Sequence, residues 1–324
     1  MHATEELRQK LTQRISQLQY GENPHNLYEP IRYIMSLGGK RLRPLLVLLS
    51  YQLRGAKVDD IVDIALAVEV FHNFTLMHDD IMDEAPLRRG QPTVHEKWND
   101  TVAILSGDTM LIKAYDLLLQ SPPPMLHKVI SLFNKTAVEV CEGQQIDMNF
   151  ESESTVSEAD YIEMIRLKTA VLLGYSLQLG GLLSGSDDDN QSKLYEVGEK
   201  MGIGFQLMDD YLDVYADQSK FGKQVGGDII ANKKTYLLIT ALEMATGEAR
   251  ELLEDWLHRQ DFDPAAKVAG VRQIYDDIGI PNLIQLKMNY YFDQAFEGIE
   301  SVEGSPAGKE VLRTFANQLM KRDK

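Results

Sequence analysis

Two aspartate clusters with the same internal spacing constrain the fold of this chain more than any other feature. Their members are Asp79, Asp80 and Asp83, then Asp209, Asp210 and Asp213. Residues i and i+4 lie on one face of an α-helix about one turn apart, so this spacing gathers carboxylates on one helix face. Aspartate is rarely buried on an apolar helix unless it is paired or bound to metal. The clusters therefore predict two helices that present carboxylates to a cation.

Each cluster is followed by a basic segment that contains glycine. Arg88 and Arg89 follow the first cluster, and Lys223 and Lys233 follow the second. Hard divalent cations such as Mg²⁺ prefer oxygen ligands and are commonly completed by substrate phosphates, for which arginine and lysine supply fixed positive groups. A solvated, charged helix end would explain either cluster alone. The repetition favours a metal and phosphate site.

Composition and charge narrow the class of protein. The chain has 324 residues, of which 44% are hydrophobic, and a formal net charge of −16. That charge argues against nucleic acid or an anionic membrane as a general partner. Without a basic-then-apolar leader at residues 1–6 or an apolar stretch of spanning length, we expect a cytoplasmic protein that does not span a membrane. The single cysteine, Cys141, excludes an internal disulfide and is expected to be buried.

Apolar residues recur with a period near 3.6 along most of the chain, whereas sustained period-two alternation is missing. The pattern predicts an all-α protein with almost no sheet. No interior stretch resembles a linker, so we expect one domain over residues 1–324. Residues 184–190 are expected to form a surface loop. The expected helices span residues 4–20, 27–37, 45–53, 61–83, 94–120, 125–150, 158–183, 192–216, 235–258, 263–278, 281–298 and 305–320.

Lys40 and Arg43 lie beside a predicted helix start. Gly38-Gly39 is typical of a helix end, and Pro44 suits the first turn of the next helix. A helix N-terminus favours anions, so the two basic residues are candidates for phosphate binding. An ordinary helix cap with solvated charges is the alternative.

Three further polar residues interrupt apolar helical stretches. His72 lies seven residues before Asp79 and therefore on the same helix face, although a hydrogen-bonded core histidine is the alternative. Lys168 and Thr169 interrupt the apolar run that ends at Leu183, and a lysine that extends to solvent would also explain them. Together with the aspartates, these residues suit a substrate with a diphosphate head and a hydrocarbon tail.

In several ordered motifs the chain resembles the trans-isoprenyl diphosphate synthases, or polyprenyl synthetases, over roughly residues 30–280. The motifs are Gly38-Gly39-Lys40-Arg41-Leu42-Arg43-Pro44, His78-Asp79-Asp80-Ile81-Met82-Asp83 with Arg88-Arg89-Gly90, Gly143-Gln144-Gln145-Ile146-Asp147, Lys168-Thr169, Phe205-Gln206-Leu207-Met208-Asp209-Asp210-Tyr211-Leu212-Asp213, Gly222-Lys223, and Asp228 to Lys233. The resemblance implies the isoprenoid synthase fold, in which ten or more helices surround a central cavity, and a homodimer.

The resemblance also implies roles for individual residues. The catalytic set would be Asp79, Asp80, Asp83, Arg88, Lys168, Asp209, Asp210 and Lys223. Three Mg²⁺ ions, with Mn²⁺ as an alternative, would bind mainly Asp79, Asp83 and Asp209, with Asp80, Asp210 and Asp213 binding directly or through water. The allylic diphosphate would be held by Arg88, Lys168, Thr169, Gln206, Lys223 and Lys233, and isopentenyl diphosphate by Lys40, Arg43, His72 and Arg89.

The implied activity is prenyl transfer. The allylic substrate would ionise with Mg²⁺ assistance, the isopentenyl double bond would attack the cation, and the released diphosphate would take the proton. A class I terpene cyclase and a non-catalytic subunit are less favoured alternatives. A cyclase would usually carry a different second metal motif, and a non-catalytic subunit would be expected to lose motif aspartates, whereas the second motif here is rich in aspartate and no motif aspartate is missing.

The helix of the first cluster also bears on product length. Phe74 lies five residues before Asp79, about 7.5 Å deeper along a helix, and Phe71 lies one turn further. A ring there would block a growing tail, although both rings could instead pack between helices. In the family, one large aromatic residue here, with a neighbour such as Thr75 and no insertion, resembles geranylgeranyl diphosphate (C20) synthases. A farnesyl (C15) synthase is the alternative.

Overall fold

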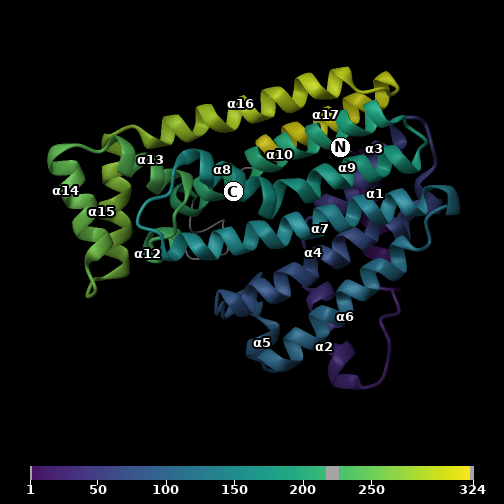
Figure 1. The fold of residues 1–324 in the computed structure, drawn as a ribbon, viewed down its shortest axis with the longest axis horizontal. Coiled ribbons are helices and arrows are strands. Elements are labelled where there is room, and N and C mark those ends of the chain that lie inside the picture. Colours follow the sequence, from purple (N-terminus) through teal and green to yellow (C-terminus); the bar gives the residue numbers. More distant parts are fainter. Residues whose placement is uncertain (1, 217–225, 322–324) are drawn as a thin grey trace. The chain divides into compact units, whose positions relative to one another are not determined.

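The computed structural model describes residues 2–216 and 226–321. These residues are almost entirely helical, and the described part of the chain contains more than ten helices (Figure 1). The predicted all-α class is therefore confirmed, while the central cavity stays a prediction. The chain divides into two compact units, which we describe separately. The single domain that we expected also stays a prediction.

Unit 1 comprises residues 1–136, 172–196 and 298–315. Its elements are α1 (His2–Ile15), α2 (His25–Ser36), α3 (Leu42–Gln52), the 3₁₀ helix η1 (Val58–Ile61), α4 (Val62–Met82), β1 (Leu87–Arg88), β2 (Gln91–Pro92), α5 (Val94–Lys97), α6 (Asp100–Leu118), the first part of α7 (Pro123–Ser152), most of α9 (Val171–Leu183), the start of α10 (Asp188–Tyr215), the end of α16 (Ile280–Ser301) and most of α17 (Pro306–Met320).

Helix α4 forms the core of unit 1. Residues 64–68 are apolar on every side of the helix and are all buried, because α3 and α6 pack against α4. The segment from Val58 to Met82 is long and apolar enough to cross a membrane by length and composition, and 72% of its most apolar window is buried inside the protein. The burial of α4 in the core of unit 1 accounts for its apolar sequence.

Unit 2 comprises residues 137–171, 197–297 and 316–324, with the gap noted above. Its elements are the second part of α7, α8 (Glu158–Ile165), the π-helix η2 (Arg166–Ala170), most of α10, α12 (Gly227–Ile230), α13 (Tyr236–Met244), α14 (Gly247–His258), α15 (Pro264–Asp277), most of α16 and the end of α17. A continuous apolar core joins these helices, and Leu207, Leu237 and Ile280 are fully buried in it. The core fixes α10, which carries the second aspartate cluster.

Several sequence predictions are wrong in detail. The helix expected over 94–120 breaks at Asn99, whose side chain accepts a hydrogen bond from the Val102 N–H at 2.9 Å and so starts α6. The stretch 184–190 is not wholly a loop, because α10 already begins at Asp188. The helix expected over 235–258 is interrupted between α13 and α14. Cys141, expected to be buried, is exposed on α7.

Candidate active site

The first aspartate cluster lies at the C-terminal end of α4. Asp83 is the residue after the last helical position, and its backbone N–H donates to the Asp79 carbonyl at 2.9 Å. The Asp83 side chain is exposed and that of Asp79 is partly exposed, whereas Asp80 is buried. The i and i+4 carboxylates therefore remain accessible, and the middle carboxylate faces the protein.

Asp80 is held by Arg88 through a bidentate ion pair. The Arg88 Nε lies 2.8 Å from both Asp80 carboxylate oxygens, and Nη2 lies 2.6 Å from Oδ1. Burial raises the pKa of Asp80 against the opposing effect of Arg88. The Arg88 guanidinium also lies 4.0 Å from the nearer Asp79 oxygen. Asp80 thus holds the Arg88 guanidinium beside the accessible carboxylates.

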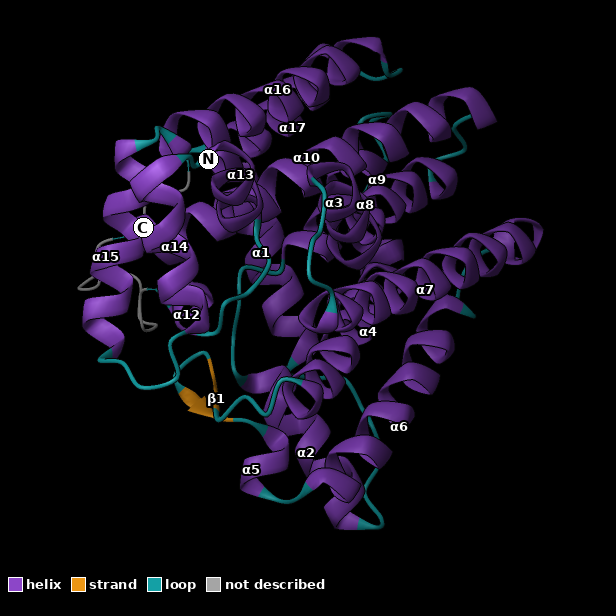
Figure 2. Cartoon of the chain, turned by 60° about the vertical axis from the view of Figure 1, so that its left-hand side comes forward, coloured by secondary structure: helices purple, strands orange, loops and turns teal. Residues whose placement is uncertain are grey.

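A short hairpin, shown in orange in Figure 2, positions Arg88. Strands β1 and β2 pair with Arg88 opposite Gln91, and the loop between them is Arg89-Gly90. Both loop residues have positive φ, 53° and 75°, which is the geometry of a type I′ turn and explains a glycine at the second position. The sequence pattern predicted a loop here and did not reveal the hairpin.

Basic residues from two segments of unit 1, residues 41–43 and 88–89, lie close enough to His72 for their charges to act on it. Burial lowers the pKa of His72 well below its usual value, and the charges of Arg43 and Arg89 lower it further. Arg89 also donates a hydrogen bond to the Gly38 carbonyl, in the same loop that carries the exposed Lys40. The predicted isopentenyl diphosphate residues therefore lie in one neighbourhood, in which a neutral imidazole is surrounded by guanidinium groups. Such a cluster suits an anionic group.

The second aspartate cluster, on α10 in unit 2, shows the same pattern of exposed and buried carboxylates as the first. Asp209 and Asp213 are partly exposed, whereas Asp210 is buried. Tyr161 donates its hydroxyl proton to Asp210 Oδ2, and Gln206 Nε2 donates to Oδ1 at 3.2 Å. Burial, with a contribution from the charge of Asp228, raises the pKa of Asp210 to about 8. In both clusters the middle aspartate is the buried one.

Further hydrogen bonds connect the second cluster to its surroundings. Gln206 Oε1 accepts from the Thr169 hydroxyl at 3.1 Å, so Tyr161, Asp210, Gln206 and Thr169 form one chain of hydrogen bonds. The Asp213 carboxylate accepts from the backbone N–H of Asp228 at 3.0 Å, at the start of α12. Thr169 and Gln206, both predicted to bind the allylic diphosphate, are therefore in direct contact.

Lys168 and Thr169 lie in the π-helix η2, where the sequence predicted an uninterrupted α-helix. Asp147, on α7, accepts from Lys168 Nζ at 2.6 Å, and Lys233 Nζ lies 3.7 Å from the same oxygen. Burial raises the pKa of Asp147, but the charges of Lys233 and Lys168 outweigh it and lower the pKa. Asp147 therefore joins two of the predicted diphosphate-binding lysines.

Gly143 allows this arrangement, because α7 passes close to the backbone of η2. A β-carbon at Gly143 would overlap the backbone of Lys168. We expect Gly143→Ala to shift η2 and to lower kcat/KM for the allylic substrate at least about tenfold, despite the higher helix propensity of alanine. Steady-state kinetics measure this effect. The control is Gln145→Ala at an exposed position of α7, and equal kinetics for both variants would contradict the assignment.

The donor set fits a hard cation that substrate oxygens complete. Within residues 2–216 and 226–321, no group of three or more His, Cys, Asp or Glu side chains could hold a metal unaided. Each cluster instead offers two accessible carboxylates one helical turn apart. Mg²⁺ commonly binds one or two carboxylates together with waters and substrate phosphates, so Asp79 with Asp83 and Asp209 with Asp213 suit it.

The described residues include most of the predicted site, and they add residues that were not predicted as site residues. Asp147 stood within a quoted motif, but its role was not assigned. Tyr161 and the hairpin carried no local signal. Lys223 lies outside the described residues, so its role stays a prediction. The chain-length residues lie on α4, where the Phe71 and Phe74 rings are 5.6 Å apart and the Thr75 hydroxyl donates to the His72 carbonyl at 2.8 Å.

The described helices carry two carboxylate clusters, one in each unit, and each cluster has basic side chains near it. The family model described as polyprenyl synthetase matches residues 24–278. Geranylgeranyl pyrophosphate synthase of Geoglobus acetivorans is 36% identical over 319 residues, covering 97% of this chain and 96% of the relative. The crystal structure of a geranylgeranyl pyrophosphate synthase superimposes with a TM-score of 0.94 at 42% identity, covering 99% of each chain.

A further relative, geranylfarnesyl diphosphate synthase of Natronomonas pharaonis, is 33% identical over 342 residues, covering 99% of this chain and 97% of the relative. The chain belongs to the polyprenyl synthetase family. It is an isoprenyl diphosphate synthase, a transferase of prenyl groups.

Proposed function

We propose that this enzyme condenses isopentenyl diphosphate with an allylic diphosphate (dimethylallyl, geranyl or farnesyl) and releases geranylgeranyl diphosphate. The observation that carries the product length is the place of Phe74. It lies on α4, five residues before Asp79, and its partly exposed ring packs against Phe71 and His78. Relatives named as geranylgeranyl synthases support the same product.

In the proposed reaction, Arg88, Lys168, Thr169, Gln206 and Lys233 hold the allylic diphosphate, with Lys223 as a further predicted ligand. Bound Mg²⁺, in three sites or with Mn²⁺ as a substitute, would neutralise charge on the departing diphosphate. Lys40, Arg43, His72 and Arg89 hold isopentenyl diphosphate. The allylic carbon–oxygen bond breaks, and the isopentenyl double bond attacks the resulting allylic cation to form a carbon–carbon bond. The released diphosphate then takes the proton that the isopentenyl-derived unit loses. Apolar walls around the reacting carbons exclude water.

The test of product length is incubation of the enzyme with isopentenyl diphosphate and each allylic starter in turn, with chromatography of the products. We expect C20 to dominate from every starter. Accumulation of C15 would favour the farnesyl alternative. A dominant C25 product would contradict the proposed product length and would match the product named for the Natronomonas pharaonis relative, geranylfarnesyl diphosphate. Failure of every starter to elongate would contradict the proposed activity.

Metal removal tests the role of the carboxylates. We expect a chelator to abolish condensation and added Mg²⁺ to restore it, because two accessible carboxylates per cluster bind a diphosphate only through a cation. Turnover measured before chelation, after chelation and after return of Mg²⁺ gives the result. Condensation that persists after exhaustive chelation would contradict the metal assignment.

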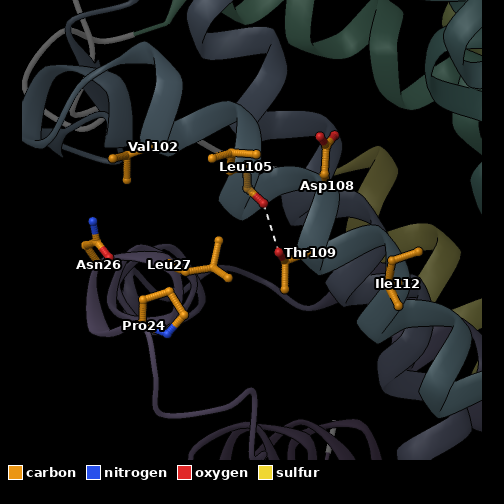
Figure 3. Close-up of a pocket in the computed structure, with 8 residues that line it drawn as sticks. All are labelled: Pro24, Asn26, Leu27, Val102, Leu105, Asp108, Thr109 and Ile112. Atoms are coloured by element: carbon orange, nitrogen blue, oxygen red, sulfur yellow. Dashed lines mark hydrogen bonds between the residues drawn. The ribbon is translucent and has the colours of Figure 1, made fainter.

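We also propose that the enzyme is a homodimer and that α6 contributes to its interface. Leu105 and Ile112 on α6 and Leu119, the residue immediately after it, recur every seven residues, and each is more than half exposed. Beside them, a groove of about 430 Å³ lies between the start of α2 and α6 (Figure 3). A second copy of the chain would cover these apolar side chains.

Size-exclusion chromatography with light scattering tests the dimer. We expect the enzyme to elute as a dimer and Ile112→Glu to shift it towards monomer, because a carboxylate in the apolar stripe would have to be desolvated. The matched control is Leu252→Glu, at an exposed leucine on α14. A monomeric wild-type protein, or equal behaviour of the two variants, would contradict the proposed interface.

We further propose that the enzyme works in the cytoplasm and does not span a membrane. The net charge of −16 and the burial of the apolar helix α4 support this location. Cell fractionation tests it.

A further inference from the structure

Arg41 is a buried cation with no role in the proposed reaction. Its side chain is 4% exposed, and it contacts a carboxylate that is 3% exposed. Nη1 donates to Glu69 Oε1 at 2.6 Å, and Nη2 donates to the Met35 carbonyl at 2.7 Å. Since α4 and the end of α2 both accept hydrogen bonds from this guanidinium, we do not assign Arg41 as a phosphate ligand.

Asn73 completes the arrangement from the next turn of α4. Its Nδ2 donates to the Glu69 carbonyl at 2.8 Å and lies 3.2 Å from Glu69 Oε1. Asn73 is fully buried and Glu69 is 2% exposed as a whole residue. Buried charges are retained when each is paired and hydrogen-bonded, and both partners here meet that condition. Arg41, Glu69 and Asn73 therefore form one network, which we call the Arg41 network.

The backbone of Arg41 shows why the network matters for its neighbours. Arg41 adopts φ 49° and ψ 41°, a left-handed conformation that favours glycine or asparagine. It is the residue immediately before α3, so its conformation sets the direction in which the chain enters that helix. Lys40 precedes it and Arg43 follows within the first helical turn. A guanidinium fixed at two points stabilises an otherwise unfavourable backbone between two predicted substrate ligands.

The same loop meets the other predicted isopentenyl diphosphate residues. Arg89 donates to the Gly38 carbonyl, and Arg41, Arg43 and Arg89 are all close enough to lower the pKa of His72. His72 lies on α4 between Glu69 and Asn73 in sequence. The network thus joins the loop that carries Lys40 and Arg43 to the helix that carries His72.

We propose that Arg41, Glu69 and Asn73 are positioning residues for the isopentenyl diphosphate site, because they hold the loop of residues 38–43 against α4. This inference rests on the proposed function. It predicts that a defect in the network weakens isopentenyl diphosphate binding more than allylic diphosphate binding.

Glu69→Gln tests the proposal, because it keeps the shape of the side chain and removes its charge. Two possible roles of Glu69 predict opposite changes in KM for isopentenyl diphosphate. If the network positions the loop, KM for isopentenyl diphosphate rises by about 10- to 100-fold, while KM for the allylic substrate changes less than about twofold. If Glu69 only offsets positive charge, its removal makes the site more positive and KM for isopentenyl diphosphate falls. An unchanged or lower KM would overturn the proposal.

The matched control is Asp63→Asn, on the same helix. Asp63 is also a carboxylate of α4 that pairs with an arginine. Its partner, Arg14, lies on α1 and donates to both carboxylate oxygens, at 2.6 and 2.7 Å. We expect this variant to lower the thermal midpoint without changing KM for either substrate. A rise in KM for isopentenyl diphosphate equal to that of Glu69→Gln would show that loss of any such ion pair suffices, and would overturn the proposal.

A second variant and a binding measurement keep the test decisive if Glu69→Gln does not fold. Arg41→Lys keeps the charge but cannot reach both acceptors, and we expect the same selective rise in KM with a smaller size. Calorimetric titration with isopentenyl diphosphate alone reports binding without turnover, and equal affinity for wild type and variant would overturn the proposal. Failure of the wild-type enzyme to elongate any starter would instead contradict the proposed function.

Discussion

Replacing Asp79 by asparagine is expected to reduce turnover about a thousandfold or more while α4 remains folded. Asp79 is an accessible carboxylate of the first cluster, and Asp83 lies one helical turn away. A metal ion that stabilises a leaving group contributes several kcal/mol to catalysis, and about 1.4 kcal/mol corresponds to a tenfold change in rate. Asparagine keeps the size of the side chain but loses the charge that a hard cation requires. Steady-state kinetics and helical circular dichroism measure the two parts of the prediction.

Three further variants sharpen the test of Asp79. Asp59→Asn, at a carboxylate exposed on η1, is expected to leave turnover unchanged. Asp80→Asn is expected to lower both activity and the thermal midpoint, because it weakens the buried pair with Arg88. Asp209→Asn should behave like Asp79→Asn. Turnover of Asp79→Asn within tenfold of wild type would contradict the metal assignment.

Replacing Phe74 by alanine is expected to shift the main product from C20 to longer chains. The Phe74 ring is partly exposed, and its neighbours are Phe71 at 5.6 Å and the His78 ring at 4.8 Å between centroids. The ring lies about 7.5 Å along the helix from Asp79, so its removal opens space for further isoprene units. Chromatography of products from the farnesyl starter gives the distribution.

Phe71→Ala separates packing from control of product length. Phe71 is fully buried, and its ring meets Phe133 at 5.1 Å in an edge-to-face contact. We therefore expect its replacement to cost about 3–5 kcal/mol of unfolding free energy, as is usual for a large core side chain. A lengthened product from Phe71→Ala together with an unchanged product from Phe74→Ala would place the limit one turn deeper.

The sequence predicted those features of the structure that depend on a particular residue type at a particular spacing. The spacing of Asp79 and Asp83 placed two carboxylates on one helix face. The helix expected from residue 158 does begin there, as α8, where Ser157 and Asp160 form a capping box. The sequence is consistent with either a limit on product length or core packing for Phe71 and Phe74. The structure supports core packing for Phe71. These features are local, so a single helix determines them.

Features that depend on contacts between distant segments could not be predicted. Asp147 joins Lys168 and Lys233, which lie 21 and 86 positions further along the chain. The π-helix at Lys168 lies against Gly143, where a β-carbon would overlap the backbone, and neither residue reveals the other in the sequence. The burial of Asp80 and Asp210 is of the same kind. Helical spacing places each middle aspartate about 100° around the helix from its neighbour, but it does not show which segments cover that side.

The buried middle aspartates affect the enzyme between turnovers. Asp80 keeps its own permanent counterion in Arg88, and burial favours the protonated form of Asp210 near neutral pH. Each cluster then carries a resting charge nearer −2 than −3 when product and cations have left. The carboxylates of an empty cluster therefore repel one another less than three ionised carboxylates would. The middle aspartate therefore adds little to the repulsion between the two accessible carboxylates while the site is empty.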